Sequence, residues 1–391
     1  MASTTFLIFL EIDHTLFIGT ILLETIMITL GFILILLSGF SDGSFYVPAK
    51  YTKKWEWEHY WAVFSIGFFV ISWILTVVLI PNIFSIYGSV EPKEIYMIMV
   101  FGALWGVGAI LFGTALHMLG MALAYPITLG TVACFGAAVP LLTTEIDSLF
   151  SIKGLMVIVG MSITVIGIIT CSRAFKAKGD DENSGRKSTT LVVGLLVAVF
   201  AGVFSALINI GFSFAENVIA KAHEMGVHSI LSGISPWCLF FSIAFIVNFG
   251  YCLYLMLKRK NTKALWTPDL PRNFSLGIAM GALFVCAVYI YSMGATCLGS
   301  WGEVPGWIVF MSVDILTGNV WGLWMGEWDL APKKARQLLK LGMVTIILAI
   351  IIVAIGQCLS IERSADSEDS AKIFQNLSQK INFTSELTLL E

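Results

Sequence analysis

Ten long apolar stretches recur along the chain, and they constrain its fold more than any other feature. About 20 apolar residues in a helix span the roughly 30 Å hydrocarbon layer of a bilayer. Only 13% of the residues are charged, whereas a soluble domain carries about 25%. The sequence therefore predicts an all-α membrane protein with ten transmembrane helices, at 27–47, 61–82, 96–117, 120–142, 154–173, 190–212, 234–257, 274–297, 301–326 and 338–359.

An internal repeat divides these stretches into two halves. A shift of 179 positions aligns Gly102-Ala103-Leu104 with Gly281-Ala282-Leu283, Leu119-Gly120 with Leu298-Gly299, and Pro126 with Pro305. Each half holds five stretches, and five is an odd number, so the second half must enter the membrane upside down. Inverted five-helix repeats are typical of secondary transporters, which bind substrate near the midplane and work by alternating access. The third and fourth stretches are so close in sequence that they must form a tight hairpin.

Lys and Arg residues in the loops predict the orientation, because they stay on the cytoplasmic side. The loops after the first, fifth, seventh and ninth stretches carry sixteen cations, and the opposite loops carry only Lys93, Lys153 and Lys221. The first stretch therefore starts outside the cell. We divide the chain into an unassigned extension (1–26), a first half (27–173), a cytoplasmic linker (174–189), a second half (190–359) and a disordered polar tail (360–391).

The apolar stretch within residues 301–328 carries two carboxylates, Glu303 and Asp314. At about 100° per residue, a helix places both acids on one narrow face with Trp307 and Trp321. A carboxylate in hydrocarbon costs at least a few kcal/mol unless it is compensated, so it usually faces a cavity and marks a transport pathway. We expect Glu303 first, and Asp314 second, to be proton-coupling acids. The alternative is an interfacial Glu303 and a hydrogen-bonded core acid at Asp314.

Polar and indole side chains inside the predicted helices are the candidate substrate ligands. Indole faces stack on the apolar face of a sugar ring while polar neighbours take its hydroxyls. The candidates are Asp42, Trp105, Ser205, Asn209, Trp307 and Trp321. Asp42 can equally cap a helix break, and core packing is the alternative for each Trp. A second group, Trp55, Trp57 and Trp61, predicts an aromatic belt at the membrane interface.

Several blocks resemble the bacterial L-rhamnose–proton symporter family of the drug/metabolite transporter superfamily. These blocks are Phe45-Tyr46-Val47-Pro48 with Lys53-Lys54-Trp55-Glu56-Trp57-Glu58, Phe101-Gly102-Ala103-Leu104-Trp105-Gly106-Val107-Gly108, Leu119-Gly120-Met121, Phe204-Ser205 and Glu327-Trp328. The similarity covers about residues 27–359. The resemblance implies ten helices in two inverted halves and proton-coupled uptake of a 6-deoxyhexose across the bacterial inner membrane, without a cofactor.

The chain also departs from that family. Glu303 falls where the family has an acid before the Trp, but the surrounding Gln and Tyr residues are absent here. Asp42 and Asp314 occupy positions where the resemblance leads us to expect uncharged residues. These differences bear on the identity of the sugar more than on the fold. An exporter or facilitator of the same superfamily that moves another small metabolite is therefore the alternative function.

Other classes of function are disfavoured by the sequence. No HExxH, GxSxG or phosphate-cradling loop occurs, so an enzyme is not expected. The seven cysteines lie in apolar stretches without CxxC spacing, which indicates neither a metal site nor a disulfide framework. A net charge of −3 gives no indication of nucleic-acid binding. The expected partners are a small sugar and the lipid bilayer.

Overall fold

A computed structural model describes residues 25–143, 150–178, 188–298 and 306–356, and the regular structure in these ranges is helical throughout. Eight helices in this part of the chain are long and apolar enough to cross a membrane. The predicted class, an all-helical multi-pass membrane protein, is therefore confirmed. The extension 1–24, the tail from residue 357 and most of the linker lie outside the described residues.

Within the described residues, helical segments overlap each of the ten predicted stretches. The long helices are the first helix (25–44), α2 (Trp57–Leu79), α4 (Pro92–Leu119), α5 (Met121–Thr143), α6 (Ile152–Lys178), α7 (Ser188–Ala206), α8 (Ile208–Glu224), α10 (Trp237–Arg259), α11 (Leu270–Leu298), α12 (Trp307–Trp324) and the last helix (Lys333–Gly356). Short helices connect them: η1 (Val47–Tyr51), α3 (Ile83–Gly88), α9 (Ser229–Ser232) and η3 (Thr262–Leu265). Within hydrocarbon a helix is favoured because it satisfies every backbone hydrogen bond internally.

The sixth predicted stretch differs most from the structure. We expected one helix ending at 212, but α7 and α8 together reach Glu224, with a break at Leu207. The helix continues beyond the apolar run because Ala, Glu and Lys in this segment are good helix formers. At the break, the Leu207 N–H donates to the Phe204 carbonyl at 3.3 Å, a tightened turn in place of the α-helical pattern.

The predicted hairpin between the third and fourth stretches is confirmed. Gly120 alone separates α4 from α5 and adopts φ +83°, a conformation that favours glycine. A Cβ atom at this position would also lie 2.7 Å from Oε2 of Glu327, a residue that is distant along the chain. The turn thus requires glycine for its backbone and for the close approach of another segment.

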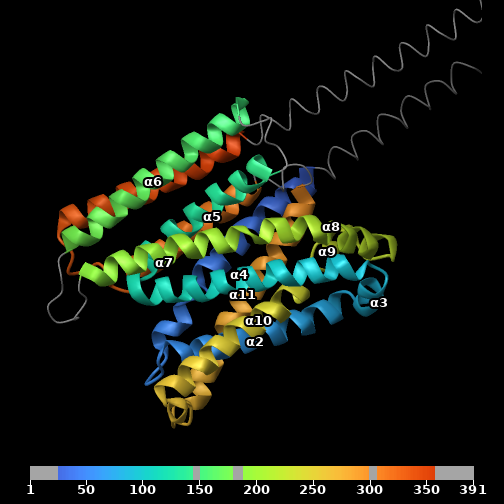
Figure 1. Cartoon of the computed structure of the whole chain (residues 1–391), viewed down its shortest axis with the longest axis horizontal. Helices are drawn as coiled ribbons and strands as arrows, with labels where there is room; N and C mark the ends of the chain where they lie inside the picture. Colours follow the sequence, from blue (N-terminus) through green and yellow to red (C-terminus); the bar gives the residue numbers. More distant parts are fainter. Residues whose placement is uncertain (1–24, 144–149, 179–187, 299–305, 357–391) are drawn as a thin grey trace, which may run out of the picture.

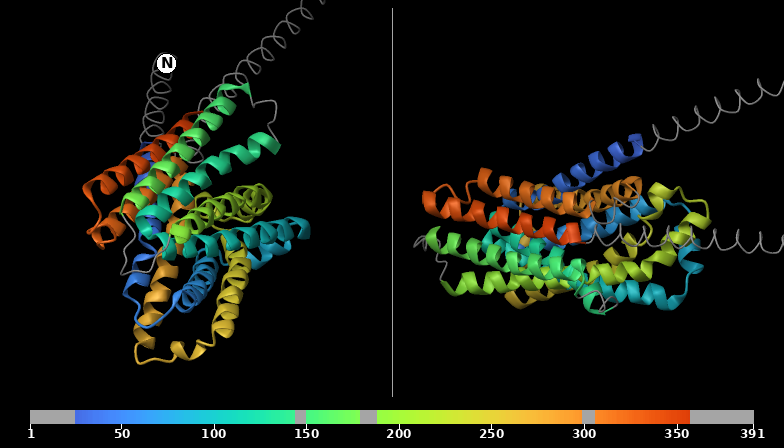
Figure 2. Two further views of the ribbon diagram at one scale, coloured as in Figure 1. Left: turned by 60° about the vertical axis from the view of Figure 1, so that its left-hand side comes forward. Right: turned by 90° about the horizontal axis from the view of Figure 1, so that it is seen from above.

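The helices form a bundle with two edges and a central layer (Figures 1 and 2). One edge consists of α2, α10 and α11, which pack on each other through small residues such as Gly67 of α2 against Gly281 of α11. The other edge pairs α6 with the last helix, where Gly160 and Gly167 meet Val353 and Ile346. Between these edges lie α4, α5 and α7, so side chains from many helices meet in the centre.

Candidate functional site

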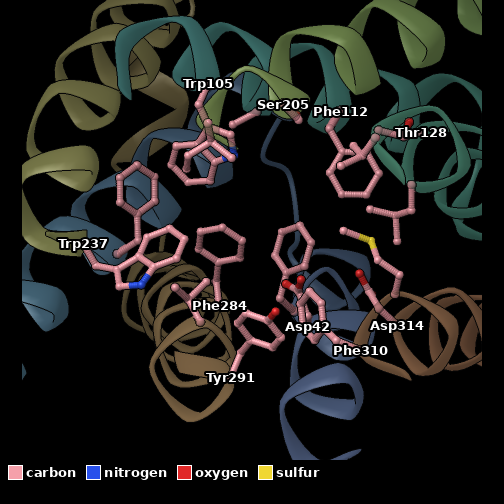
Figure 3. A pocket seen from close by; sticks show the side chains of 18 of the residues that line it. Asp42, Trp105, Phe112, Thr128, Ser205, Trp237, Phe284, Tyr291, Phe310 and Asp314 are labelled. Carbon is pink, nitrogen blue, oxygen red and sulfur yellow. The ribbon is translucent and has the colours of Figure 1, made fainter. Parts of the chain in front are cut away.

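A cavity lies in the centre of the bundle (Figure 3). Its volume is about 130 Å³. An engineered cavity of about 150 Å³ in another protein binds benzene, so this volume suits a single six-membered ring. Most of the long helices contribute to its walls: the first helix, α2, α4, α5, α7, α8, α10, α11 and α12. Phe45, which follows the first helix, also lines it. Both halves of the chain therefore build the cavity.

Two carboxyl groups lie together at one wall of this cavity (Figure 3). Asp42 of the first helix and Asp314 of α12 are within hydrogen-bonding range of each other. Asp314 is 1% exposed, and the Oδ1 atoms of both residues are buried without a hydrogen-bond partner among the described residues. Two carboxylates at such a distance repel each other unless they share a proton. One proton shared between the two carboxyl groups would relieve this repulsion.

The remaining walls are mostly aromatic. Trp105 and Phe284 stack with ring centroids 5.8 Å apart, and Trp307 meets Tyr291 edge to face at 5.4 Å. Trp237 at the start of α10 packs on Phe241 at 5.5 Å. Flat rings that hold each other in fixed orientations present a rigid apolar surface to a ligand. This cavity can therefore accept the apolar face of a ring-shaped molecule.

Across the cavity from Asp42 lies Ser205, next to the break between α7 and α8 (Figure 3). Ser205 and Ile208 flank this break at Leu207, and both line the cavity. Thr128 of α5 also lines it, with its hydroxyl donating to the Ala198 carbonyl at 3.2 Å. Irregular backbone at membrane depth is tolerated where it lines a cavity, and it often marks a functional position.

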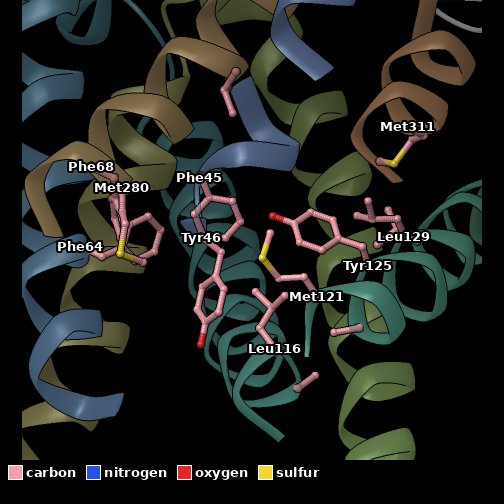
Figure 4. Packing of buried hydrophobic residues seen from close by; sticks show 14 of the residues in the cluster. Phe45, Tyr46, Phe64, Phe68, Leu116, Met121, Tyr125, Leu129, Met280 and Met311 are labelled. Carbon is pink, nitrogen blue, oxygen red and sulfur yellow. The ribbon is translucent and has the colours of Figure 1, made fainter. Parts of the chain in front are cut away.

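A layer of packed side chains lies near Lys50, whose Nζ is 5.8 Å from the centre of the Tyr46 ring. Figure 4 shows Tyr46 beside other buried residues of this layer. Tyr46, Leu116, Met121 and Tyr125 are each at most 2% exposed. The Tyr125 hydroxyl donates to the Asp42 carbonyl at 3.2 Å. This layer separates the cavity from the predicted cytoplasmic surface.

Glu327 joins several segments just beyond that layer. Its carboxylate accepts from the backbone N–H groups of Met121 and Ala122, at 3.0 and 3.2 Å, and pairs with Lys50 Nζ at 2.9 Å. Lys178 donates to the Glu327 carbonyl at 2.8 Å and lies 5.2 Å from the ring centre of Trp328. A carboxylate at a helix N-terminus is stabilised by the free N–H groups and by the helix dipole. Glu327 thereby ties the second half of the chain to three segments of the first.

The structure brings most of the expected site residues together. Five of the eight candidates line the cavity: Asp42, Trp105, Ser205, Trp307 and Asp314. Two lie outside its lining. Asn209 lies against Gly136 of α5, and the Trp321 Nε1–H donates to Ser44 Oγ at 2.8 Å. Glu303 lies outside the described residues, so the prediction about it stays a prediction.

Sequence reasoning missed several aromatic members of the site. The belt prediction was wrong for Trp61, which is 1% exposed, lines the cavity and donates to Asn248 Oδ1 at 2.9 Å. Tryptophans near a helix end are typical of an interface, but here η1 and α10 cover this end of α2. Phe45, Trp237 and Tyr291 also line the cavity. Phe45 belongs to one of the blocks that carry the family resemblance, whereas the signal for Trp237 and Tyr291 was the high aromatic share of the apolar stretches.

Comparison with known proteins places the chain in a family. The family model described as L-rhamnose-proton symport protein (RhaT) matches residues 24–359. The chain belongs to the L-rhamnose–proton symporter family. It is 29% identical over 341 residues to the L-rhamnose-proton symporters of Escherichia coli O1:K1 / APEC and of Shigella boydii serotype 18, covering 84% of this chain and 98% of each relative. Members of this family are transporters, so the prediction that the chain is not an enzyme is confirmed.

Proposed function

We propose that this protein imports a 6-deoxyhexose, with L-rhamnose as the first candidate, in symport with protons across the bacterial inner membrane. The observation that carries the proposal is the Asp42–Asp314 pair beside a ring-sized aromatic cavity. This arrangement occurs in a chain that matches a proton symporter family over nearly its whole apolar length. The proton is the coupling ion, and the chemistry needs no other cofactor.

Proton coupling requires an acid whose protonation changes with the access state of the cavity. When the cavity admits water, a carboxylate is hydrated and releases its proton; when water is excluded, the charged form is strongly disfavoured. Asp314, held against Asp42 at the cavity wall, meets this requirement. We therefore propose Asp314, together with Asp42, as the coupling site. Glu303 is a second candidate and is included in the test below.

The sugar is proposed to lie between the indoles of Trp105 and Trp307. Neither indole N–H has a hydrogen-bond partner among the described residues, so both can donate to ring oxygens or hydroxyls. Ser205 at the helix break supplies a hydroxyl on the opposite wall. Asn209 and Trp321, also predicted as ligands, are better placed to hold neighbouring helices around the site.

The architecture proposed for this function is ten crossings in two inverted halves. Matching contacts in the two halves support it. Gly43 of the first helix lies against Thr317 and the Asp314 carbonyl, and Gly202 of α7 lies in the same way against Thr131 and the Thr128 carbonyl. In these contacts Thr128 of α5 takes the place that Asp314 takes on α12, which is about two helical turns from the pairing given by the shift of 179 positions. The first half thus contributes a hydroxyl where the second contributes an acid.

The geometry fits a carrier closed toward the cytoplasm. The cavity extends toward Trp237 and Trp307, the first residues of α10 and α12, which the loop charges assign to the outer side. The packed layer at Tyr46 and Tyr125 and the Glu327 contacts close the other side. We propose that sugar and proton enter from outside and that opening inward breaks the Glu327 contacts.

Uptake into proteoliposomes tests the function. Labelled L-rhamnose should accumulate under an imposed inward proton gradient, and collapse of the gradient should abolish accumulation. Asp314→Asn should lose accumulation and retain exchange of labelled for unlabelled sugar, because the neutral side chain mimics the protonated carrier. Asp269→Asn, which removes a carboxylate paired with Lys54 at 3.9 Å outside the cavity, is the matched control.

The same assay separates Asp314 from Glu303 as the coupling acid, and sugar uptake from transport of another metabolite. If Asp314→Asn accumulates sugar to the wild-type level and Glu303→Gln does not, the coupling role belongs to Glu303. If a panel of labelled 6-deoxyhexoses is neither bound nor exchanged by folded protein, the exporter or facilitator of another metabolite becomes the better assignment.

A further inference from the structure

The charges around the cavity do not balance. Two carboxyl groups line it, and among the described residues none of the other lining side chains is Lys, Arg or His. Among the described residues, the titratable groups that face the pair are phenols: Tyr125 donates to the Asp42 carbonyl, and the Tyr291 hydroxyl points toward Asp42 (Figure 3). One shared proton leaves the pair with a single negative charge.

That residual charge lies in an apolar surrounding. Asp314 is 1% exposed, and aromatic side chains form most of the wall. An uncompensated charge at membrane depth is costly, and buried charges in proteins are normally paired. None of the described lining residues offers a cationic partner, and we infer that the partner arrives with the cargo. It is either a further proton or a cationic group of the substrate.

The other walls favour the cationic group. Several polar atoms of the wall are already engaged: Thr128 donates to Ala198, Trp61 to Asn248 and Trp237 to Ser292. Few donors and acceptors are thus left for a molecule with many hydroxyls. Aromatic faces, in contrast, attract a cation directly through their electron-rich rings. An aromatic enclosure with an anionic pair is a binding site for an ammonium group attached to a ring.

We propose that the preferred substrate is an amino sugar, a deoxyhexose in which one hydroxyl is replaced by an ammonium group. This inference rests on the proposed function and specifies its substrate class. The ring stacks on the indoles of Trp105 and Trp307, and the ammonium group donates to the free Oδ1 atoms of Asp42 and Asp314. The shared proton and the ammonium group together neutralise the two carboxylates. A neutral sugar needs a second proton instead.

The proposal gives each of the two acids a role. The fold brings Asp42 of the first helix and Asp314 of α12 together at one wall of the cavity. A single acid is sufficient to bind one coupling proton. A second acid in contact with it provides the charge that a cationic substrate requires.

Equilibrium binding to purified protein tests the proposal. The probes are an amino-deoxyhexose, its N-acetyl derivative, which is neutral, and L-rhamnose. Binding is followed by tryptophan fluorescence, since several indoles line the cavity. We expect the amine to bind about tenfold to a hundredfold more tightly than both neutral probes, the usual range for a hydrogen bond to a charged group. Equal affinities for the amine and the neutral probes would overturn the proposal.

The pH dependence of the wild-type protein gives a second readout that needs no variant. As the pH rises from about 5 to about 6.5, carboxyl groups lose protons, while an ammonium group with a pKa near the α-amino range of about 7.7–8.0 keeps its charge. Amine binding should therefore strengthen, whereas L-rhamnose binding should weaken. Parallel responses of the two probes would contradict the inference.

Variants then separate this inference from the proposed function. Asp42→Asn and Asp314→Asn should each reduce the preference for the amine about tenfold relative to L-rhamnose. If L-rhamnose accumulates with protons and the amine has no advantage, the inference fails and the proposed function stands. If the amine binds tightly and L-rhamnose is neither bound nor transported, the neutral sugar is wrong and the cationic substrate is supported.

Discussion

Removing the Glu327 side chain should open the predicted cytoplasmic side of the carrier. Glu327→Ala deletes the acceptor for two N–H groups at the start of α5 and the partner of Lys50. Loss of a capping carboxylate costs about 1 kcal/mol, within a range of about 0.5–2 kcal/mol. The ion pair adds about 0.2–1 kcal/mol, since the Lys50 side chain is 34% exposed and solvent screens it.

In the proposed mechanism these contacts exist only while this side is closed, so their loss acts on the equilibrium between access states. A total of about 1–3 kcal/mol corresponds to a shift of roughly fivefold to 150-fold toward the inward-open state. Lys50→Ala should have a smaller effect, because it removes the ion pair and leaves both N–H contacts. The order of the two variants is itself a prediction.

Cysteine accessibility measures the shift. A cysteine replaces Leu116, which is fully buried in the closing layer (Figure 4), in a chain whose seven native cysteines have been substituted. A membrane-impermeant thiol reagent applied from the cytoplasmic side should label it faster in Glu327→Ala. Glu224→Ala is the matched control, because the Lys221–Glu224 pair has the same 2.9 Å length on the opposite surface. An unchanged labelling rate in Glu327→Ala would refute the closing role.

Three further predictions concern the site, the packing and the orientation. Trp307→Ala should weaken sugar binding by about 1–3 kcal/mol, as for other buried aromatic anchors. Trp324→Ala, the control, changes a side chain that is 75% exposed and should leave the affinity unchanged; calorimetric titration measures both affinities. Gly281→Ala should destabilise the bundle by about 1–3 kcal/mol, because its Cβ would lie 2.6 Å from the Gly67 backbone. Gly250→Ala, whose Cβ meets no atom within 4 Å, should not lower the melting temperature in the same way; thermal unfolding in detergent measures both variants. A cysteine at position 180 should react with an impermeant reagent only from the cytoplasmic side, and labelling of intact cells would reverse the assigned orientation.

The fold class and the helix positions follow from the sequence because hydrocarbon leaves the backbone few choices. An apolar run long enough to cross the bilayer must satisfy its own hydrogen bonds, so each run becomes a helix. The tight turn at Gly120 was predictable for the same reason, since two long runs met with almost no residues between them. The break at Leu207 was not, because no proline or glycine marks it and both flanking segments are helical.

The candidate site was predictable only in part. The helical period placed Asp314 and Trp307 on one face, and both line the cavity. The period describes a single helix, however, and says nothing about which other helix lies opposite that face. It therefore paired Asp314 with Glu303 of its own stretch, whereas the structure sets Asp42 from the other half of the chain against it.

The sequence by itself determined that this chain is a helical membrane protein and where most of its long helices lie, because these depend on local apolar length. The tertiary structure alone decided that Asp42 and Asp314 meet, that Trp61 is buried at the cavity and that Glu327 contacts Lys50 and the start of α5. Those contacts depend on how helices from the two halves pack, through close approaches such as Gly43 on Thr317 and Gly67 on Gly281. Packing of this kind joins residues that are far apart in the chain, and no local pattern encodes it.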